Sequence, residues 1–389
     1  MSTKERAHSP LGPSSAHRWI ACPPSVKLSQ LYADKSSNYA AIGTEAHMLA
    51  EYKIRHCLGL VDKSQCPIPN LKHYDAEMDD CTTDFAVYVL NLFDKAHQAS
   101  RDPELLLEER LDYSTFVPEG FGTCDVVIAA DYTAYVSDFK YGQGVLVSAE
   151  RNPQLMLYAL GLLEMYGHIY DIEQVHMSIF QPRREHISTT VLSVQEIYDW
   201  AETILKPAAQ LAYRGEGECK VGDHCQFCRA RAECRARAAH NMKITRQAFR
   251  LPPLLTDEEI ESLLEQLDGF ISWAKSIQDH AFSEALKGKK WQGFKLVSGR
   301  ANRVFTDKKA VEETALAAGY SEIYKKELLP LTALEKALGK EAFNKVLGEF
   351  VTKPPGKPTL VPESDKRTAL DITSAAEAFS AEPIEEEDI

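Results

Sequence analysis

Hydrophobic and polar positions along the first half of the chain follow two periods, one typical of helices and one typical of strands. Helical spacing predicts helices over residues 13–33, 43–59, 81–99, 154–167 and 194–213. Alternation of apolar and polar residues predicts strands over residues 105–113, 126–128, 135–140, 174–181 and 187–192. The polar stretch 61–80 contains two prolines and is expected to be a loop. The elements thus run in the order helix, strand, strand, strand, helix, strand.

Two of the predicted strands lie close together within residues 122–140, and their short connection predicts a hairpin. Asp125 opens the first apolar run, and Asp138 and Lys140 close the second. A hairpin brings the two acids to one edge of the sheet although thirteen positions separate them. Because Asp138 and Lys140 are two residues apart, they point to the same face, whereas Phe139 faces the other way.

This arrangement suits metal-assisted chemistry on a phosphate. Neighbouring carboxylates bind a divalent cation, and an ammonium group beside them can stabilise the negative charge that develops at phosphorus. Two acids and a lysine at this spacing also occur on ordinary solvated hairpins. The hairpin alone therefore does not identify a site.

Two helices carry pairs of polar residues on one face. His47 and Glu51 are four residues apart in the helix predicted over 43–59, and Gln154 and Tyr158 are four apart in the apolar helix that follows the hairpin. Each pair taken alone is as well explained by a helix with a polar side.

Composition sets the outer limits of the function. The chain has 389 residues, 44% of them hydrophobic, which is enough to bury a sizeable core in one large domain or two of moderate size. No apolar run approaches membrane-spanning length and the N-terminus lacks a signal-peptide core, so a cytoplasmic protein without a membrane partner is expected.

The net charge of -13 is unevenly distributed. Five acids lie in the last eight residues, whereas residues 206–250 carry ten Lys or Arg against four acids, and residues 287–309 carry eight against one. Local basic patches decide whether a phosphate backbone can bind, so the acidic total does not exclude a nucleic-acid partner.

Three cysteines, Cys225, Cys228 and Cys234, have the spacing C-x2-C-x5-C and stand among arginines that favour the thiolate form. Thiols at this spacing can hold one metal centre. The centre is either zinc, completed locally by Cys219 or His224, or a 4Fe-4S cluster completed by a distant cysteine.

Residues 14–240 resemble the PD-(D/E)XK nuclease superfamily, and within it the RecB-like branch that includes the CRISPR-associated RecB-like exonucleases and the AddB nucleases. The resemblance rests on GTEAH, GTCDVV, SDFK and QLMLY in this order. It implies a restriction-endonuclease-like α/β core that binds Mg2+ or Mn2+. The metal ligands implied are His47, Asp125, Asp138 and the carbonyl of Phe139, and the catalytic set adds Lys140, Gln154 and Tyr158 to the acids.

Within this branch, Gln154 and Tyr158 match a helix that helps to hold DNA and the catalytic lysine, and Glu108 or Glu109 would supply an outer-shell acid. Thr123 and Cys124 stand where the branch often has an arginine before the acid. The contacts made just before Asp125 are therefore not implied by the resemblance.

The same branch carries an iron-sulfur cluster with three C-terminal cysteines at the C-x2-C-x5-C spacing and one cysteine just before the nuclease core. Cys22 occupies that upstream place, although a lone cysteine at such a corner is more often a packed core residue. The resemblance thus implies a 4Fe-4S cluster bound by Cys22, Cys225, Cys228 and Cys234, which joins the first and last parts of the domain. The remaining cysteines at 57, 66, 81 and 124 are then structural.

A second unit is expected after Pro252 and Pro253. The organisation predicted is a nuclease domain over 1–240, a linker over 241–256, a smaller α+β region over 257–353 and a disordered acidic tail over 354–389. Thr256 and Glu259 form a capping box before a long amphipathic helix, and a basic strand pair is predicted over 288–305. There Lys289, Lys290, Trp291 and Arg300 are candidates for binding single-stranded DNA, and a packed hairpin with a solvated basic face explains them as well.

The whole-chain pattern, including GFKLVSGRANR and KPTLVPESDKR, resembles an uncharacterised phage-associated family with a RecB-like nuclease domain. The function expected is a metal-dependent exonuclease that acts on single-stranded DNA or duplex ends in phage recombination or end processing. It would work in the bacterial host cytoplasm, with a recombinase or single-strand-binding protein as partner. Two other classes remain open: a catalytically silent DNA-binding or annealing module, and a zinc-stabilised scaffold.

Overall fold

The computed structural model describes residues 9–33, 38–243 and 255–295, together with residues 339 and 345. The chain divides into two compact units, Met1–Lys289 and Lys290–Ile389. The fold described below belongs to the first unit. Arg300, most of the region predicted over 257–353 and the whole predicted tail lie outside the described residues.

The chain begins with two short helices, as their proline-rich boundary predicts. A 3-10 turn at Pro13–Ser15 leads into α1 (Ala16–Ala21), and α2 (Ser25–Gln30) follows the two prolines. Trp19 is fully buried and its indole N–H donates to the carbonyl of Gly12 over 3.1 Å. Cys22 ends α1 and is buried at the corner between the two helices.

Two long helices, α3 (Asn38–Cys57) and α4 (Ala76–Ala99), pack on each other. The loop predicted over 61–80 ends earlier than expected. Asp75 caps α4 by accepting a hydrogen bond from the backbone N–H of Met78, so the helix starts five residues before the predicted position 81.

The sheet contains five strands in the order β1-β2-β3-β4-β5. All neighbours are antiparallel except β3 and β4, which are parallel. The hairpin predicted within 122–140 is confirmed as β2 and β3. The strand bounds are β1 Glu104–Asp112, β2 Phe121–Ala129, β3 Tyr132–Phe139, β4 Ile172–Gln181 and β5 His186–Ser193.

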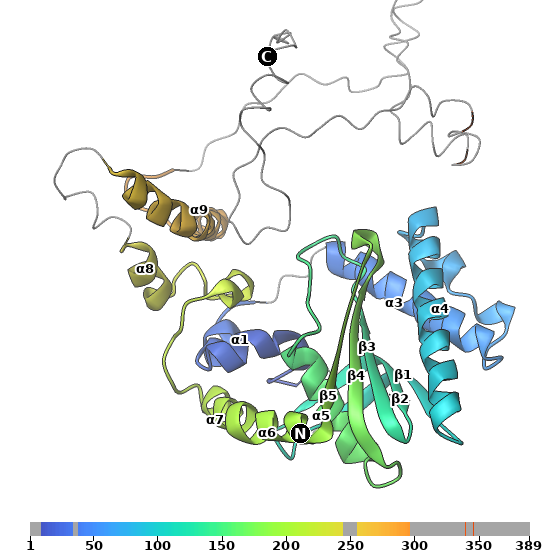
Figure 1. Ribbon diagram of the computed structural model, residues 1–389. Helices are drawn as coiled ribbons and strands as arrows, with labels where there is room; N and C mark the ends of the chain where they lie inside the picture. Colours follow the sequence, from blue (N-terminus) through green and yellow to red (C-terminus); the bar gives the residue numbers. More distant parts are fainter. Residues whose placement is uncertain (1–8, 34–37, 244–254, 296–338, 340–344, 346–389) are drawn as a thin grey trace, which may run out of the picture. The chain divides into compact units, whose positions relative to one another are not determined.

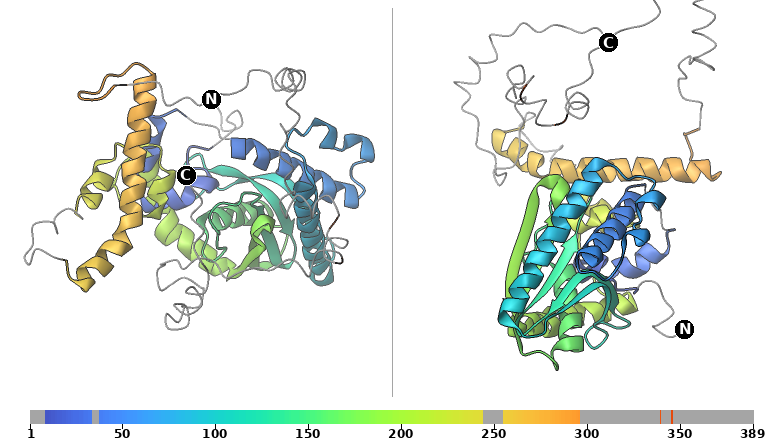
Figure 2. Two further views of the ribbon diagram at one scale, coloured as in Figure 1. Left: turned by 90° about the horizontal axis from the view of Figure 1, so that it is seen from above. Right: turned by 90° about the vertical axis from the view of Figure 1, so that its right-hand side faces the viewer.

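Helices cover both faces of this mixed sheet (Figure 1). The helix α5 (Pro153–Tyr166) connects the parallel strands, and α6 (Val194–Trp200) continues through a π turn into α7 (Lys206–Arg214). One buried cluster joins α1, α5, α6 and α7 to one face of the sheet, and a second joins α3 and α4 to the opposite face. Figure 2, right, looks onto the second face, with α3 and α4 in front of the strands. The structure is thus a mixed α/β fold.

The cysteine segment and the long amphipathic helix complete the described part. A 3-10 turn at Asp223–Phe227 precedes α8 (Arg235–Asn241), and α9 (Asp257–Leu286) begins at the predicted capping box of Thr256. Residues 288–295 form turns and no strand, and the rest of the predicted basic strand pair lies outside the described residues. None of the described helices has the length and hydrophobicity needed to cross a bilayer.

Gly161 allows α5 to approach β1 closely, and this contact can be tested. A Cβ atom at this position would lie 2.7 Å from Cβ of Leu111 and 3.4 Å from its backbone. We expect Gly161→Ala to lower the free energy of unfolding by about 1–3 kcal/mol, because a packed strand must shift. Gly43→Ala, in α3 with no atom within 4 Å of the new Cβ, is the control and should be neutral or stabilise by up to about 1 kcal/mol. Equal effects in chemical denaturation would contradict the close approach.

Candidate functional site

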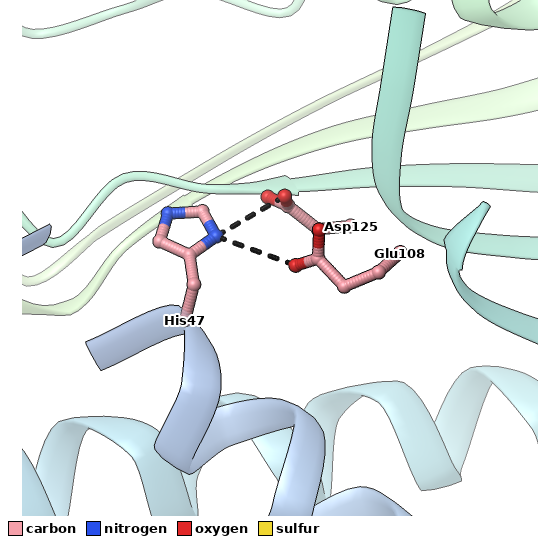
Figure 3. A group of neighbouring side chains, drawn as sticks. All are labelled: His47, Glu108 and Asp125. Carbon is pink, nitrogen blue, oxygen red and sulfur yellow. Dashed lines mark hydrogen bonds and ion pairs between the residues drawn. The ribbon is translucent and has the colours of Figure 1, made fainter. Parts of the chain in front are cut away.

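Three side chains from three elements meet on the side of the sheet that α3 covers (Figure 3). Nδ1 of His47, on α3, lies 3.1 Å from Oδ1 of Asp125 on β2 and 3.8 Å from Oε1 of Glu108 on β1. The candidate ligand atoms of the three residues lie within 4.8 Å of one another. With Phe139 they line a small cavity of about 10 Å³, which is the size of one water molecule or ion.

Asp125 lies in the middle of β2, not at its start as predicted, and its carboxylate joins the site to the next strand. Oδ2 accepts a hydrogen bond of 2.6 Å from the backbone N–H of Phe139. The pairing of β2 with β3 ends at Val126 and Ser137, so this side-chain bond replaces a backbone bond where the two strands separate. One carboxylate thus positions both the imidazole of His47 and the end of β3.

The backbone of Glu108 has an unusual conformation. Its φ is 53°, in the left-handed region that non-glycine residues rarely adopt. The register of β1 with β2 is the same before and after Glu108, so Glu108 stands opposite Asp125. These two residues nevertheless do not pair in the hydrogen-bonded ladder of the two strands. Holding a non-glycine residue in this conformation costs about 1–3 kcal/mol, and such residues concentrate at functional sites.

The structure separates the two candidate outer-shell acids. Glu108 lies within reach of His47. Burial raises the pKa of Tyr166, on α5, and the charges of Glu104 and Glu109 raise it further, so Glu109 faces α5 on the other side of β1. Sequence reasoning left the choice open because alternation along a strand does not show which acid faces a helix histidine.

A second group of side chains lies beside the first and consists of Asp138, Lys140 and two residues of α5, Gln154 and Tyr158. Nζ of Lys140 lies 2.8 Å from Oδ2 of Asp138 and 3.3 Å from Oε1 of Gln154. The amide nitrogen of Gln154 donates to Oδ1 of Asp138 over 2.8 Å and to the hydroxyl of Tyr158 over 3.3 Å. The structure therefore brings Asp138, Lys140, Gln154 and Tyr158 into one group. Asp138 lies outside the close group of His47, Glu108 and Asp125.

The charges of the two groups affect one another. Burial alone would lower the pKa of His47, but hydrogen bonds to Asp125 and Glu108, with the charges of Asp125 and Asp138, raise it to about 10. Burial raises the pKa of Asp138, which the charge of Lys140 lowers and that of Asp125 raises further. For Lys140, burial lowers the pKa, but the contact with the charged Asp138 and the charge of Asp125 together raise it above its ordinary value. Without a cation, the acids of the two groups are balanced by His47 and Lys140.

The donor set fits a hard divalent cation. Asp138 is 3% exposed, and its Oδ2 lies 2.8 Å from Nζ of Lys140. A buried carboxylate needs charged partners, and a cation can be one of them beside this lysine. Carboxylate oxygens and one imidazole are ligands that Mg2+ and Mn2+ accept.

Five cysteines and a histidine gather at the other end of the domain. Cys22 and Cys228 are 7% and 8% exposed, and Sγ of Cys228 lies 3.9 Å from Oγ of Ser29 on α2. A hydrogen bond with Cys22 raises the pKa of His224. Burial, followed by the neighbouring Cys22, Cys234 and Cys228, raises that of Cys219 to about 11.

The three cysteines of the C-x2-C-x5-C segment share one neighbour, since the charges of Cys225, Cys234 and Cys228 all act on Arg237. None of the nine cysteines forms a disulfide. Cys219 lies closer to Cys22 than the sequence suggested. In the described part of the chain, no three cysteine or histidine ligand atoms come within 4.8 Å of one another.

The candidate DNA-binding residues after α9 are only partly described. Lys289 and Lys290 are exposed, and Trp291 is half-buried. Arg300 lies outside the described residues, so the predicted stacking surface stays a prediction.

A family model described as "Protein of unknown function (DUF2800)" matches residues 8–368, and the chain belongs to this family. A solved structure described as "Crystal structure of SSO0001" is similar over 55% of this chain and 95% of that one, with 12% identity and a TM-score of 0.23. A TM-score this low carries no argument about fold or function.

Divalent-cation binding tests the site geometry independently of any activity. We expect Asp125→Asn and Glu108→Gln each to weaken Mn2+ binding at least tenfold in a calorimetric or electron-paramagnetic titration, because each removes a charged oxygen ligand. Glu109→Gln is the matched control and should bind Mn2+ as the wild type does, since this side chain faces α5. Equal loss in Glu108→Gln and Glu109→Gln would contradict the assignment of Glu108.

Proposed function

We propose that this protein is a divalent-metal-dependent DNA nuclease whose catalytic domain is a RecB-like member of the PD-(D/E)XK superfamily. One observation carries the proposal: an acid on β2, an acid on β3 and the lysine that follows β3 lie close to a histidine from α3 and a glutamine from α5. This combination of oxygen donors and a partly buried ammonium group suits hydrolysis of a phosphodiester.

The cation would be Mg2+ or Mn2+, held by Asp125 and Asp138 with His47, Glu108 and the carbonyl of Phe139. When bound, such a cation lowers the pKa of a coordinated water and polarises the phosphate. The protein's own groups do the rest. Lys140 brings a positive charge to the place where negative charge develops, and the hydrogen bond to Gln154 keeps its ammonium group directed into the site.

Gln154 and Tyr158 support this lysine from α5. The amide of Gln154 contacts Asp138, Lys140 and the Tyr158 hydroxyl at once, so a change in one of these contacts moves the others. Tyr158 is only 5% exposed, and burial raises its pKa far above the ordinary value, so its hydroxyl stays protonated. Both residues position the acid and the lysine, and the part of Gln154 near the surface can contact the DNA strand.

The cysteine group would hold a 4Fe-4S cluster on Cys22, Cys225, Cys228 and Cys234. A single zinc ion with Zn–S bonds of about 2.3 Å would hold its thiolates about 3.8 Å apart. In the part of the chain that the structure describes, no three cysteine or histidine ligand atoms lie within 4.8 Å of one another, and such a spacing suits a larger centre better than one zinc ion. The cluster would join the corner between α1 and α2 to the segment before α8.

In the cell, we propose an exonuclease that trims single strands or duplex ends during phage recombination or end processing in the host cytoplasm. A recombinase or single-strand-binding protein would be its partner. Lys289, Lys290 and Trp291 would add contacts to single-stranded DNA, by phosphate neutralisation and base stacking.

The nuclease proposal is tested by separating catalysis from binding. We expect Lys140→Ala to lower Mg2+- or Mn2+-dependent cleavage of end-labelled DNA by at least about a hundredfold, because charge stabilisation in the transition state is lost. DNA affinity should stay within about twofold. Lys95→Ala, on the exposed side of α4, is the control and should cleave normally. Near-wild-type cleavage by Lys140→Ala would contradict the role of this lysine, and a wild type that binds DNA without cleaving it would indicate a silent binding module.

The cluster is tested by metal analysis. Protein purified without oxygen should be brown and contain about four irons per chain, and Cys22→Ser should lose both colour and iron. Cys219→Ser should keep them, because this cysteine is not among the proposed ligands. Stoichiometric zinc without iron, or the reverse order of the two variants, would replace the cluster by a zinc site.

A further inference from the structure

Arg237, on α8, carries a positive charge in the interior without a carboxylate partner. It is 4% exposed, and no acid among the described residues lies at ion-pair distance from its guanidinium. Its side chain donates to the carbonyl of Arg231 over 3.4 Å, to the hydroxyl of Ser276 over 3.5 Å and to that of Ser272 over 3.3 Å. These long bonds to neutral acceptors do not compensate the loss of hydration of a buried charge.

Arg237 lies beside the cysteine segment, because it donates to the carbonyl of Arg231, which stands between Cys228 and Cys234. Burial lowers the pKa of the guanidinium, and Cys225, Cys234 and Cys228 are the groups that raise it. Cys225 and Arg237 line the same cavity, of about 380 Å³, between the cysteine segment and α9. Asp223, Glu265 and Asp268 also line this cavity, but none of them lies within 4 Å of the guanidinium. The cysteine segment is therefore the neighbouring part of the described chain that can supply a counter-charge to Arg237 once a bound metal holds its cysteines as thiolates.

The side of α9 that packs against Arg237 is polar. Ser272 and Ser276 of α9 face Arg237, and His280, one turn on, pairs with Glu233 at 3.0 Å. At about 100° per residue, the exposed Leu264 and Ile271 lie about 80–140° around the helix from these two serines, on a different side. Apart from Trp273, few apolar side chains hold α9 in place, so its position depends on the polar contacts around Arg237.

We propose that Arg237 is the counter-ion of the metal–thiolate centre and positions α9 against it. This inference rests on the metal centre of the proposed function. Four thiolates around either an iron-sulfur cluster or a zinc ion leave net negative charge, which one buried guanidinium balances in part. Binding of the metal then stabilises Arg237 in its buried place, and Arg237 holds α9 through Ser272 and Ser276. Loss of the metal leaves an uncompensated buried charge and loosens the helix.

Hydrogen exchange measured by mass spectrometry, with metal content determined on the same samples, tests this coupling. In the anaerobic, metal-loaded protein we expect Arg237→Gln to speed amide exchange in residues 257–286 at least tenfold, while exchange in β3 stays unchanged. Arg237→Lys keeps the charge and should restore much of the protection. Arg235→Gln, on the exposed side of the same helix, is the matched control and should behave as the wild type.

Removal of the metal from the wild type with a chelator should produce the same faster exchange in residues 257–286. If the wild type contains metal but α9 exchanges equally before and after chelation, Arg237 is not a counter-ion and the inference is wrong, whereas the nuclease proposal stands. If the wild type contains no metal on its cysteines, the metal centre itself fails and the inference fails with it. The metal analysis distinguishes these two outcomes.

Discussion

The candidate site depends on the carboxylate of Asp125, which forms two hydrogen bonds in different directions. One oxygen contacts the imidazole of His47 on α3, and the other accepts the backbone N–H of Phe139 on β3. The second bond stands where the pairing of β2 with β3 has ended. This bond fixes the backbone at Phe139, which stands between Asp138 and Lys140. The carboxylate that can bind a cation therefore also determines where the neighbouring acid and lysine lie.

The two halves of the site belong to opposite faces of the sheet. Phe139 packs in the buried cluster under α3 and α4, with its ring 5.3 Å from that of His47. Tyr158 packs in the cluster under α1 and α5, and Gln154 of α5 contacts Asp138 and Lys140. A cation bound here would therefore connect helices on the two faces of the sheet. Under the proposed function, the cysteine group would act in a similar way, because Cys22 and Ser29 lie beside Cys219 and Cys228.

Much of this arrangement could be predicted from the sequence because periodicity and turn chemistry are local. The hairpin, the helix that carries His47 and the helix that carries Gln154 all follow from such patterns. Three features could not be predicted, each for a physical reason. The left-handed backbone of Glu108 has no glycine to signal it, the start of α4 depends on one cap at Asp75, and the closeness of Cys219 to Cys22 is a tertiary contact. The α+β region predicted over 257–353 stays a prediction, because most of it lies outside the described residues.

The central claim is that one cation joins Asp125 of β2 to Asp138 of β3. Diffraction from a crystal soaked in Mn2+, measured for anomalous signal, tests it most directly. The account predicts a manganese peak in contact with both carboxylates, with His47 or Glu108 completing the coordination. A peak bound by His47, Glu108 and Asp125 without Asp138, or no peak at this site, would contradict it.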